Sequence, residues 1–417
     1  MSTQPGLLPG ALEEPTVPVR RGFITAVVLA NLGIMLAFYT PIQNLLPRLA
    51  QDVAPDSKEA ALAWITGAGA FASIIFNPLA GALSDRTTAR WGRRKPWVLL
   101  GALVGAMAIL ALGLPGTVLG LALIWFLAQM SVNAAYAGLT ATVPDQVPVR
   151  QRGLVSGWVG LAQTLGVVLG VAIVSFVVTD LRAGLVVTAV LLVVLVMPFV
   201  LGARDIPLRR ENQPAFSLGQ WLRGFWISPR LYPDFAWAWL TRFLMMLGNA
   251  MATLYLLFWL QDEVGYAEPE QGQTVLIALY AFGTMLTAVV FGAMSDRSGR
   301  RKIYVISATG IMAVAAVILA FFPVFPAAML AALILGLGYG MYLGVDQALV
   351  TQVLPRAIDR GRDLGVINIA NSAPQVLAPV IAAPIVTGAG GYTSLYLLTA
   401  VITLLSAVLV TRIRSVP

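Results

Sequence analysis

Long apolar segments alternate with short polar ones along almost the whole chain. From Gly22 onward, apolar stretches of about 20 residues recur up to the C-terminus, and about 20 such residues are enough for a helix to cross a hydrocarbon core of about 30 Å. The pattern predicts twelve membrane-spanning helices over 22–46, 60–83, 96–115, 117–142, 152–179, 182–202, 234–261, 271–294, 302–322, 326–352, 363–388 and 391–411.

Three short motifs occur twice, at nearly the same spacing. The pairs are Ser84-Asp85-Arg86 with Ser295-Asp296-Arg297, Gln51-Asp52 with Gln261-Asp262, and Arg152-Gly153 with Arg360-Gly361. Such a repeat is typical of transporters built from two halves, with the substrate site near the middle of the membrane. We predict an N-terminal tail over 1–21, a six-helix bundle over 22–203, a linker over 204–233 and a second six-helix bundle over 234–417.

The linker carries one apolar stripe at helical spacing, made by Leu218, Trp221, Leu222 and Phe225. The stripe predicts a short amphipathic helix on the cytoplasmic membrane surface. A loop helix buried against the protein would show the same spacing, so the two alternatives stay open.

The composition indicates an all-α integral membrane protein. Hydrophobic residues make up 58% of the chain, charged residues 11%, and the mean hydropathy is +0.82. Because the chain has no cysteine and no histidine, the usual zinc and iron ligand sets cannot form, and we find no nucleophile with a base for an enzyme. We expect no metal, no cofactor and no enzymatic activity.

The basic residues are distributed unevenly between the two predicted sides of the membrane. With the N-terminus in the cytoplasm, 23 of the 27 Lys and Arg residues fall in the tails and even-numbered loops, and only Arg48, Lys58 and Arg182 in the odd-numbered loops. Cytoplasmic loops are enriched in Lys and Arg. We therefore predict a multi-pass protein of a bacterial inner (plasma) membrane with both termini cytoplasmic, and we expect the lipid bilayer, not nucleic acid, as its partner.

The repeated loops carry the most specific motif. The first contains Gly81-Ala-Leu-Ser-Asp85-Arg86 followed by Trp91-Gly-Arg93-Arg94-Lys95, and the second contains Gly292-Ala-Met-Ser-Asp296-Arg297-Ser-Gly-Arg300-Arg301-Lys302. This pair resembles the signature loop of the major facilitator superfamily. The longer first loop resembles the sucrose-transporter and glycoside-pentoside-hexuronide symporter branches. The resemblance implies a monomer with twelve helices in two pseudo-symmetric bundles.

The resemblance also implies a cytoplasmic gate. Asp85 would dock on the start of helix eleven near Arg360 and Arg362, and Asp296 on the start of helix five near Arg152. The alternative is that these charges only anchor the loops in the cytoplasm. The residues expected in this gate are Asp85, Arg86, Arg93, Arg94, Asp145, Arg152, Asp296, Arg297, Arg300, Arg301, Arg360 and Arg362.

Two charged residues lie deep within predicted spans. Arg242 in helix seven and Asp346 in helix ten are both roughly 10 Å inside the membrane boundary, where a charge is costly and needs a reason. If they pair, an aspartate that loses its arginine partner as the protein rocks can load a proton. A permanent structural salt bridge is the alternative.

Neutral polar residues recur on one face of several predicted helices. Amides and phenols suit a small neutral polar solute such as a sugar, whereas a single buried amide more often joins helices. Convergence of these faces on one cavity is implied by the resemblance. The expected substrate-binding residues are Tyr39, Gln43, Gln129, Asn133, Tyr136, Gln163, Asn249, Tyr255, Trp259, Tyr339, Tyr342, Asn368, Asn371 and Gln375.

The lack of acidic residues in two predicted helices limits the possible coupling ions. Helix two has no acidic residue except Glu59 at its outer edge, so the sodium-site aspartates of hexuronide-type symporters have no counterpart. We predict alternating access with proton-coupled uptake of a sugar or similar solute. The alternatives are a proton-coupled antiporter that exports a drug or metabolite and, because helix one lacks an acid, facilitated diffusion.

Overall fold

The computed structural model of the chain describes residues 15–208, 219, 228–353, 360–388 and 390–415. Each of the twelve predicted spans is occupied by helix, and no strand occurs in these described residues. The first half holds α1 (Arg21–Thr40), η1 (Pro41–Leu45), α2 (Leu46–Val53), η2 (Pro55–Ser57), α3 (Lys58–Asp85), α4 (Lys95–Ala111), α5 (Val118–Gln146), α6 (Val149–Ala172), η3 (Ile173–Val177) and α7 (Leu181–Gly202). The second half holds α9 (Pro233–Leu254), α10 (Leu256–Asp262), α11 (Pro269–Ser298), α12 (Arg301–Phe321), α13 (Phe325–Val353), α14 (Arg360–Val386) and α15 (Gly391–Val410).

Within the described residues, eleven helical segments are long and apolar enough to span a membrane. The remaining predicted span, 96–115, corresponds to α4, an apolar helix of 17 residues. At 1.5 Å per residue it is about 25 Å long, close to the thickness of a hydrocarbon core. The first span is longer than predicted, because helix continues from Arg21 through a π-helical turn at Pro41–Leu45 to Val53.

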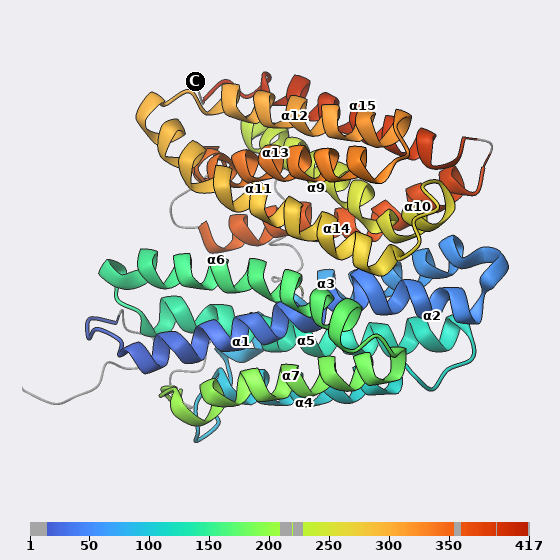
Figure 1. Ribbon diagram of the computed structural model, residues 1–417. Coiled ribbons are helices and arrows are strands. Elements are labelled where there is room, and N and C mark those ends of the chain that lie inside the picture. The colour runs from blue at the N-terminus through green and yellow to red at the C-terminus, as the bar shows by residue number, and fades with distance from the viewer. Residues whose placement is uncertain (1–14, 209–218, 220–227, 354–359, 389, 416–417) are drawn as a thin grey trace, which may run out of the picture. The chain divides into compact units, whose positions relative to one another are not determined.

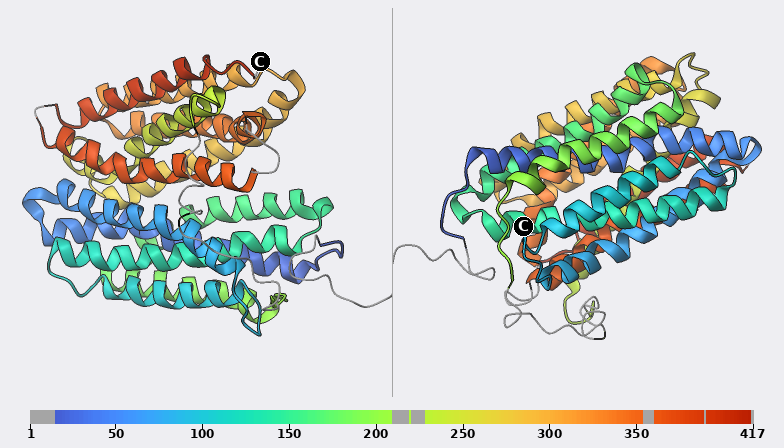
Figure 2. Two further views of the ribbon diagram at one scale, coloured as in Figure 1. Left: turned by 180° about the vertical axis from the view of Figure 1, so that it is seen from behind. Right: turned by 90° about the horizontal axis from the view of Figure 1, so that it is seen from below.

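The chain forms two compact units. The first takes residues 1–41, 72–115 and 123–216, and the second takes 42–71, 116–122 and 217–417. Figures 1 and 2 show each as a bundle of long helices. The outer ends of the first two spans therefore belong to the second unit, whereas the sequence repeat assigns them to the bundle predicted over 22–203. The bundle boundaries remain a prediction.

In the first unit, α1 packs against α6 and α7, and α4 packs against α7; α4 and α7 lie side by side in Figure 1. Glycines allow α6 to approach α1 closely. A Cβ atom at Gly166 would lie 2.7 Å from the carbonyl oxygen of Leu32, and one at Gly170 would collide with the hydroxyl of Thr40. Small residues at helix interfaces are a general feature of membrane proteins, where close backbone approach supplies the packing energy.

The second unit repeats these packing partners. Here α9 packs against α14 and α15, and α12 packs against α15, which are the pairs expected if the second six spans repeat the first six. The α11–α13 contact is also close, because a Cβ atom at Gly340 would collide with the carbonyl oxygen of Thr284. The hydroxyl of Thr287 donates to the carbonyl oxygen of Leu337 at 2.8 Å across the same interface.

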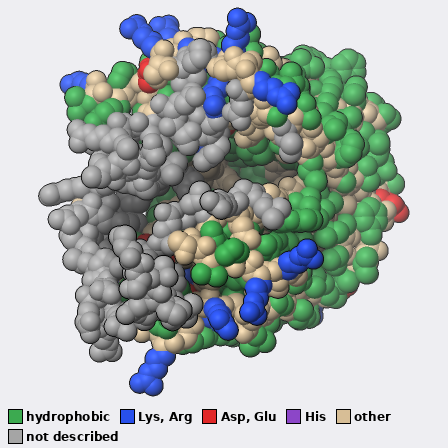
Figure 3. Space-filling view, turned by 90° about the vertical axis from the view of Figure 1, so that its left-hand side faces the viewer, with side chains coloured by type: hydrophobic (Ala, Val, Ile, Leu, Met, Phe, Trp, Pro, Cys, Tyr) green, Lys and Arg blue, Asp and Glu red, His purple; other side chains and the backbone are tan. Residues whose placement is uncertain are grey.

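Each of the two repeated loops contains a glycine with a positive φ angle. Gly92 and Gly299 have φ values of 121° and 67°, a region that side-chain-bearing residues rarely adopt. Figure 3 views the end at which α1 begins, and many described Lys and Arg side chains are visible there beside a largely hydrophobic flank. The assignment of this end to the cytoplasm stays a prediction from the loop charges.

Candidate functional site

Two of the predicted substrate residues join helices in the first unit. Asn133 on α5 donates from Nδ2 to the Ser73 hydroxyl on α3 at 2.8 Å, and that hydroxyl donates to Gln129 Oε1 at 3.0 Å. Asn77 Nδ2 donates to Asn133 Oδ1 at 3.2 Å. Gln129 and Asn133 are only 4% and 5% exposed. This network satisfies buried polar groups between α3 and α5 and corresponds to the helix-packing alternative for these two residues.

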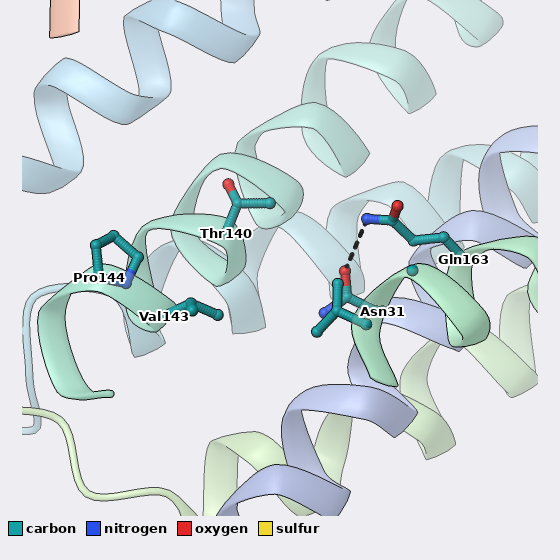
Figure 4. Close-up of a pocket in the computed structure, with 7 residues that line it drawn as sticks. Asn31, Thr140, Val143, Pro144 and Gln163 are labelled. Atoms are coloured by element: carbon teal, nitrogen blue, oxygen red, sulfur yellow. Dashed lines mark hydrogen bonds between the residues drawn. The ribbon is translucent and has the colours of Figure 1, made fainter. Parts of the chain in front are cut away.

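Gln163, unlike Gln129 and Asn133, lines a cavity of about 330 Å³ in the first unit (Figure 4). Its Nε2 donates to Asn31 Oδ1 at 3.4 Å and to the Tyr136 hydroxyl at 3.2 Å. Thr140 also lines this cavity. The remaining lining residues are Val143, Pro144, Val159 and Gly160. The cavity thus combines amide and hydroxyl groups with short apolar side chains, the mixture that can hold a hydroxylated solute.

The two deep charges of the second unit form an ion pair. Arg242 Nη1 on α9 lies 2.9 Å from Asp346 Oδ2 on α13, and the two residues are 8% and 5% exposed. The Tyr342 hydroxyl donates to Asp346 Oδ1 at 2.7 Å, and Arg242 Nε donates to Asn371 Oδ1 on α14 at 2.7 Å. The predicted ion pair thus has two neutral hydrogen-bonding partners, Tyr342 and Asn371, which help to satisfy charges buried away from water.

Two other predicted residues of the second unit, Asn249 and Tyr339, contact the side chain of Tyr280. The Tyr280 hydroxyl donates to Asn249 Oδ1 at 3.1 Å, and the Tyr280 and Tyr339 rings stack with centroids 5.7 Å apart. Gln375 on α14 is exposed, and Tyr39 on α1 of the first unit is half-buried.

Three predicted residues lie toward the outer ends of their helices. Gln43 Oε1 accepts from Gln273 Nε2 at 3.4 Å. Tyr255 is fully buried, and its hydroxyl donates to the carbonyl oxygen of Glu59 at 3.3 Å. The Trp259 ring is 1% exposed and packs edge-on against Tyr396. None of the three lines the cavity around Gln163.

The first of the two repeated loops is held by a charge network inside the first unit. The two oxygens of Asp145 each lie 2.7 Å from an arginine, Oδ1 from Arg93 Nη2 and Oδ2 from Arg94 Nε. Arg94 also pairs with Asp85 and donates to the Ser84 hydroxyl. Burial alone would lower the pKa of the Arg94 guanidinium, but hydrogen bonds and attraction to Asp145 and Asp85 outweigh it, so its pKa is raised.

Asp85 thus has a partner that the sequence did not single out. Asp85 lies at the C-terminal end of α3, where the helix dipole disfavours a carboxylate. The positive charge of Arg94 offsets this unfavourable interaction. Asp205 adds a second support, because its Oδ2 accepts from the backbone nitrogens of Arg94 and Lys95 at 2.6 and 2.8 Å at the start of α4. Arg86 is half-buried.

The second loop is only partly described. Arg297 and Arg300 are exposed, Arg301 is half-buried, and Arg300 follows the left-handed Gly299 that ends α11. The side chains of five predicted residues lie outside the described part: Arg152, Asp296, Arg360, Arg362 and Asn368. The docking of Asp85 and Asp296 on the opposite half therefore remains a prediction. The amphipathic stripe of the linker also lies outside the described residues.

Several polar residues of the cavity and of the two hydrogen-bond networks are not predicted by the sequence pattern. Asn31, Ser73 and Asn77 are isolated polar residues in apolar spans, and Thr140 and Tyr280 carry no pattern that distinguishes them from packing residues. Asn77 precedes Pro78 and follows Ser73 by four residues, so the two side chains share one helix face. That spacing is the signal from which the α3–α5 network was predictable.

Known proteins with similar sequences include sugar permeases. The general alpha-glucoside permease of Schizosaccharomyces pombe is 25% identical over 174 residues, which cover 38% of this chain and 31% of that protein. The sucrose transport protein SUC4 of Arabidopsis thaliana is 22% identical over 446 residues, covering 89% of this chain and 86% of that protein. The chain thus spans less than a third of the alpha-glucoside permease but most of the sucrose transport protein.

A solved structure shows the same fold. The crystal structure of the nucleoside transporter NupG aligns with a TM-score of 0.72 at 15% identity, covering 94% of this chain and 99% of that one. The family model of the Major Facilitator Superfamily matches residues 23–276 and 238–417. These matches confirm the twelve-helix fold and the membrane transporter class expected from the repeated loops. The chain belongs to the Major Facilitator Superfamily, as a multi-pass membrane transporter and not an enzyme.

Proposed function

We propose that this transporter takes up a sugar, or a similar small neutral polar solute, together with a proton by alternating access. We further propose that it acts as a monomer in a bacterial inner membrane with both termini in the cytoplasm. The observation that carries the proposal is the buried Arg242–Asp346 pair, with Tyr342 and Asn371 bonded to it.

Asp346 is the proton carrier in this mechanism. While Arg242 lies beside it, the carboxylate is stabilised in its charged form. If a movement of α9 or α14 draws the guanidinium toward Asn371, the carboxylate loses its counter-charge in a buried place, where a neutral acid is favoured. The carboxylate then takes a proton. Tyr342 is a positioning residue here, because its hydroxyl fixes one carboxylate oxygen.

The solute would be held by neutral groups. Asn31, Thr140 and Gln163 offer amide and hydroxyl hydrogen bonds at the cavity of the first unit without any charge, and an uncharged polyhydroxyl compound needs this kind of site. Two relatives are named for alpha-glucosides and for sucrose, which supports a glycoside as the first compound to test.

The test is transport by the purified protein in proteoliposomes with Asp346→Asn. We expect the variant to lose accumulation of a labelled sugar driven by a pH gradient and to keep exchange of that sugar at equal concentrations. The control is Asp56→Asn, which removes an exposed carboxylate in η2 and should accumulate sugar like the parent protein. Accumulation by Asp346→Asn at the parent rate would overturn proton coupling through this residue.

A second assay, thermal unfolding of the purified protein, distinguishes a sugar transporter from a drug exporter. Sugars, polyols, nucleosides and lipophilic cations are compared as ligands by the rise in melting temperature that selective binding to the folded state produces. A rise with sugars that is larger at low pH supports the proposal. A rise confined to lipophilic cations would replace it with proton-coupled export.

A further inference from the structure

A group of charged and aromatic side chains connects the outer end of α3 to the C-terminal helices, within the second compact unit. Lys58 Nζ lies 2.6 Å from Asp262 Oδ1 and 4.9 Å from the centroid of the Phe258 ring. The Tyr392 hydroxyl donates to the other carboxylate oxygen of Asp262 at 2.8 Å. We call Lys58, Phe258, Asp262 and Tyr392 the outer clasp.

The clasp shields its charges better than an ordinary surface pair. The Lys58 side chain is 14% exposed and the Asp262 side chain 35%. The ammonium group has a carboxylate on one side and an aromatic face on another, and each oxygen of Asp262 has its own partner. An exposed ion pair contributes little because water and salt screen it, whereas partial burial and the cation–π contact strengthen this one.

Further contacts secure the same region. The hydroxyl of Tyr255 donates to the carbonyl oxygen of Glu59, the residue after Lys58, at 3.3 Å. Arg48 Nε in α2 lies 3.9 Å from Glu270 Oε1 in α11. The clasp is therefore one of a set of contacts that holds residues 42–71 against α10, α11 and α15.

The position of the clasp in the sequence gives it a role in the transport cycle. Lys58 belongs to the first half of the repeat, and its partners Phe258, Asp262 and Tyr392 belong to the second half. All four lie in, or next to, odd-numbered loops, which are external in the predicted topology. When a two-half transporter opens outward, its halves separate on the external side. Opening therefore requires Lys58 to leave both Asp262 and Phe258.

We propose that the outer clasp is the external gate of this transporter, closed in the structure and broken in its outward-open state. The proposal rests on alternating access but not on the identity of the solute or on proton coupling. A ligand with unequal affinity for the two states shifts their populations, and removal of the clasp should do the same in favour of the outward-open state.

The absence of cysteine from the native chain permits a test by cysteine accessibility. Asn249→Cys places a single thiol on α9, six residues before Tyr255 and on the cytoplasmic side of the clasp in the predicted topology. Its reaction with a membrane-impermeant maleimide added outside intact cells reports external opening and needs no substrate. With Lys58→Ala added, we expect labelling to be about fivefold faster, the factor that corresponds to ~1 kcal/mol for the lost pair.

Controls separate opening from misfolding. Asp56→Ala, in the exposed turn beside the clasp, should leave the rate unchanged. The charge exchange Lys58→Asp with Asp262→Lys should return the rate toward that of the Asn249→Cys parent, which a misfolded protein would not do. A membrane-permeant maleimide verifies that the thiol reacts in every variant.

Two results would overturn the gate. One is equal external labelling of the Asn249→Cys proteins with and without Lys58→Ala, when the permeant reagent reacts with both. The other is faster labelling that the charge exchange does not reverse. Because the labelling rate is measured without added sugar and without measuring transport, failure of the gate is distinguishable from failure of the proposed uptake.

Discussion

The two halves of the sequence place polar groups at corresponding points but with different chemistry. In the first unit, Asn31, Thr140 and Gln163 line a cavity. In the second unit, Arg242, Asp346 and Asn371 form the ion pair and its amide contact. The corresponding residues are 211, 206 and 208 positions apart, close to the spacing of the repeated motifs, and Tyr136-Ala-Gly138 matches Tyr342-Leu-Gly344 in the same way.

Corresponding positions in the two halves can hold either neutral or charged polar groups, and burial of the two kinds of group costs different amounts of free energy. Neutral amides need only hydrogen bonds, and each can be replaced with modest loss. A buried charge needs a counter-charge, and removal of one partner leaves the other without compensation. The charged version therefore responds strongly to protonation and to movement of its partner, whereas the neutral version can hold an uncharged solute throughout a cycle.

The largest expected effect comes from removing only one partner of the Arg242–Asp346 ion pair. Arg242→Leu leaves Asp346 buried without its partner and should lower the free energy of unfolding by about 3–5 kcal/mol, measured by thermal or denaturant unfolding in detergent. The double variant Arg242→Asn with Asp346→Thr imitates the first unit and should recover most of this stability. A double variant as unstable as the single one would contradict the charge explanation.

An intermediate effect is expected at the neutral cavity. Gln163→Ala removes the amide that bonds to Asn31 and Tyr136, and we expect sugar binding to weaken by about 1–3 kcal/mol, measured by titration calorimetry. The control Thr164→Ala, whose hydroxyl bonds to Gly160 of its own helix, should bind sugar with unchanged affinity. Equal affinity in the Gln163 variant would assign this residue to helix packing.

The smallest effect is expected in the α3–α5 network. Asn133→Ala should reduce the free energy of unfolding by about 0.6–1.7 kcal/mol, from the average to the maximum contribution of a hydrogen bond between membrane helices, without a change in sugar affinity. Ser131→Ala is the matched control, since the Ser131 hydroxyl bonds within its own helix. A loss of affinity without a loss of stability would place Asn133 in the solute site instead.

The fold was largely predictable, and the polar site only in part. The length of the apolar segments was sufficient to locate all twelve spans, and the depth of Arg242 and Asp346 was sufficient to propose their pairing. Tyr342, predicted to bind solute, is bonded to Asp346, and Gln129 and Asn133 are bonded to α3. Helical spacing places such residues on a face but does not specify which neighbouring helix that face meets.

Long-range contacts of single residues were the least predictable. Asp262 belongs to the repeated Gln-Asp motif, but that motif does not point to Lys58, and 204 positions separate the two residues. Neither spacing nor composition relates two such residues, and their contact becomes visible only when the helices that carry them are assembled.

The sequence by itself determined the membrane spans, the two-half repeat, the expected orientation and the two deep charges. These properties depend on the free energy of moving residues from water into lipid, which local composition sets. The tertiary structure decided the partners of each polar side chain: Arg94 for Asp85, Asn31 and Tyr136 for Gln163, and Asp262 for Lys58. Helix rotation and close glycine packing fix these partners, because they bring together residues that are far apart along the chain.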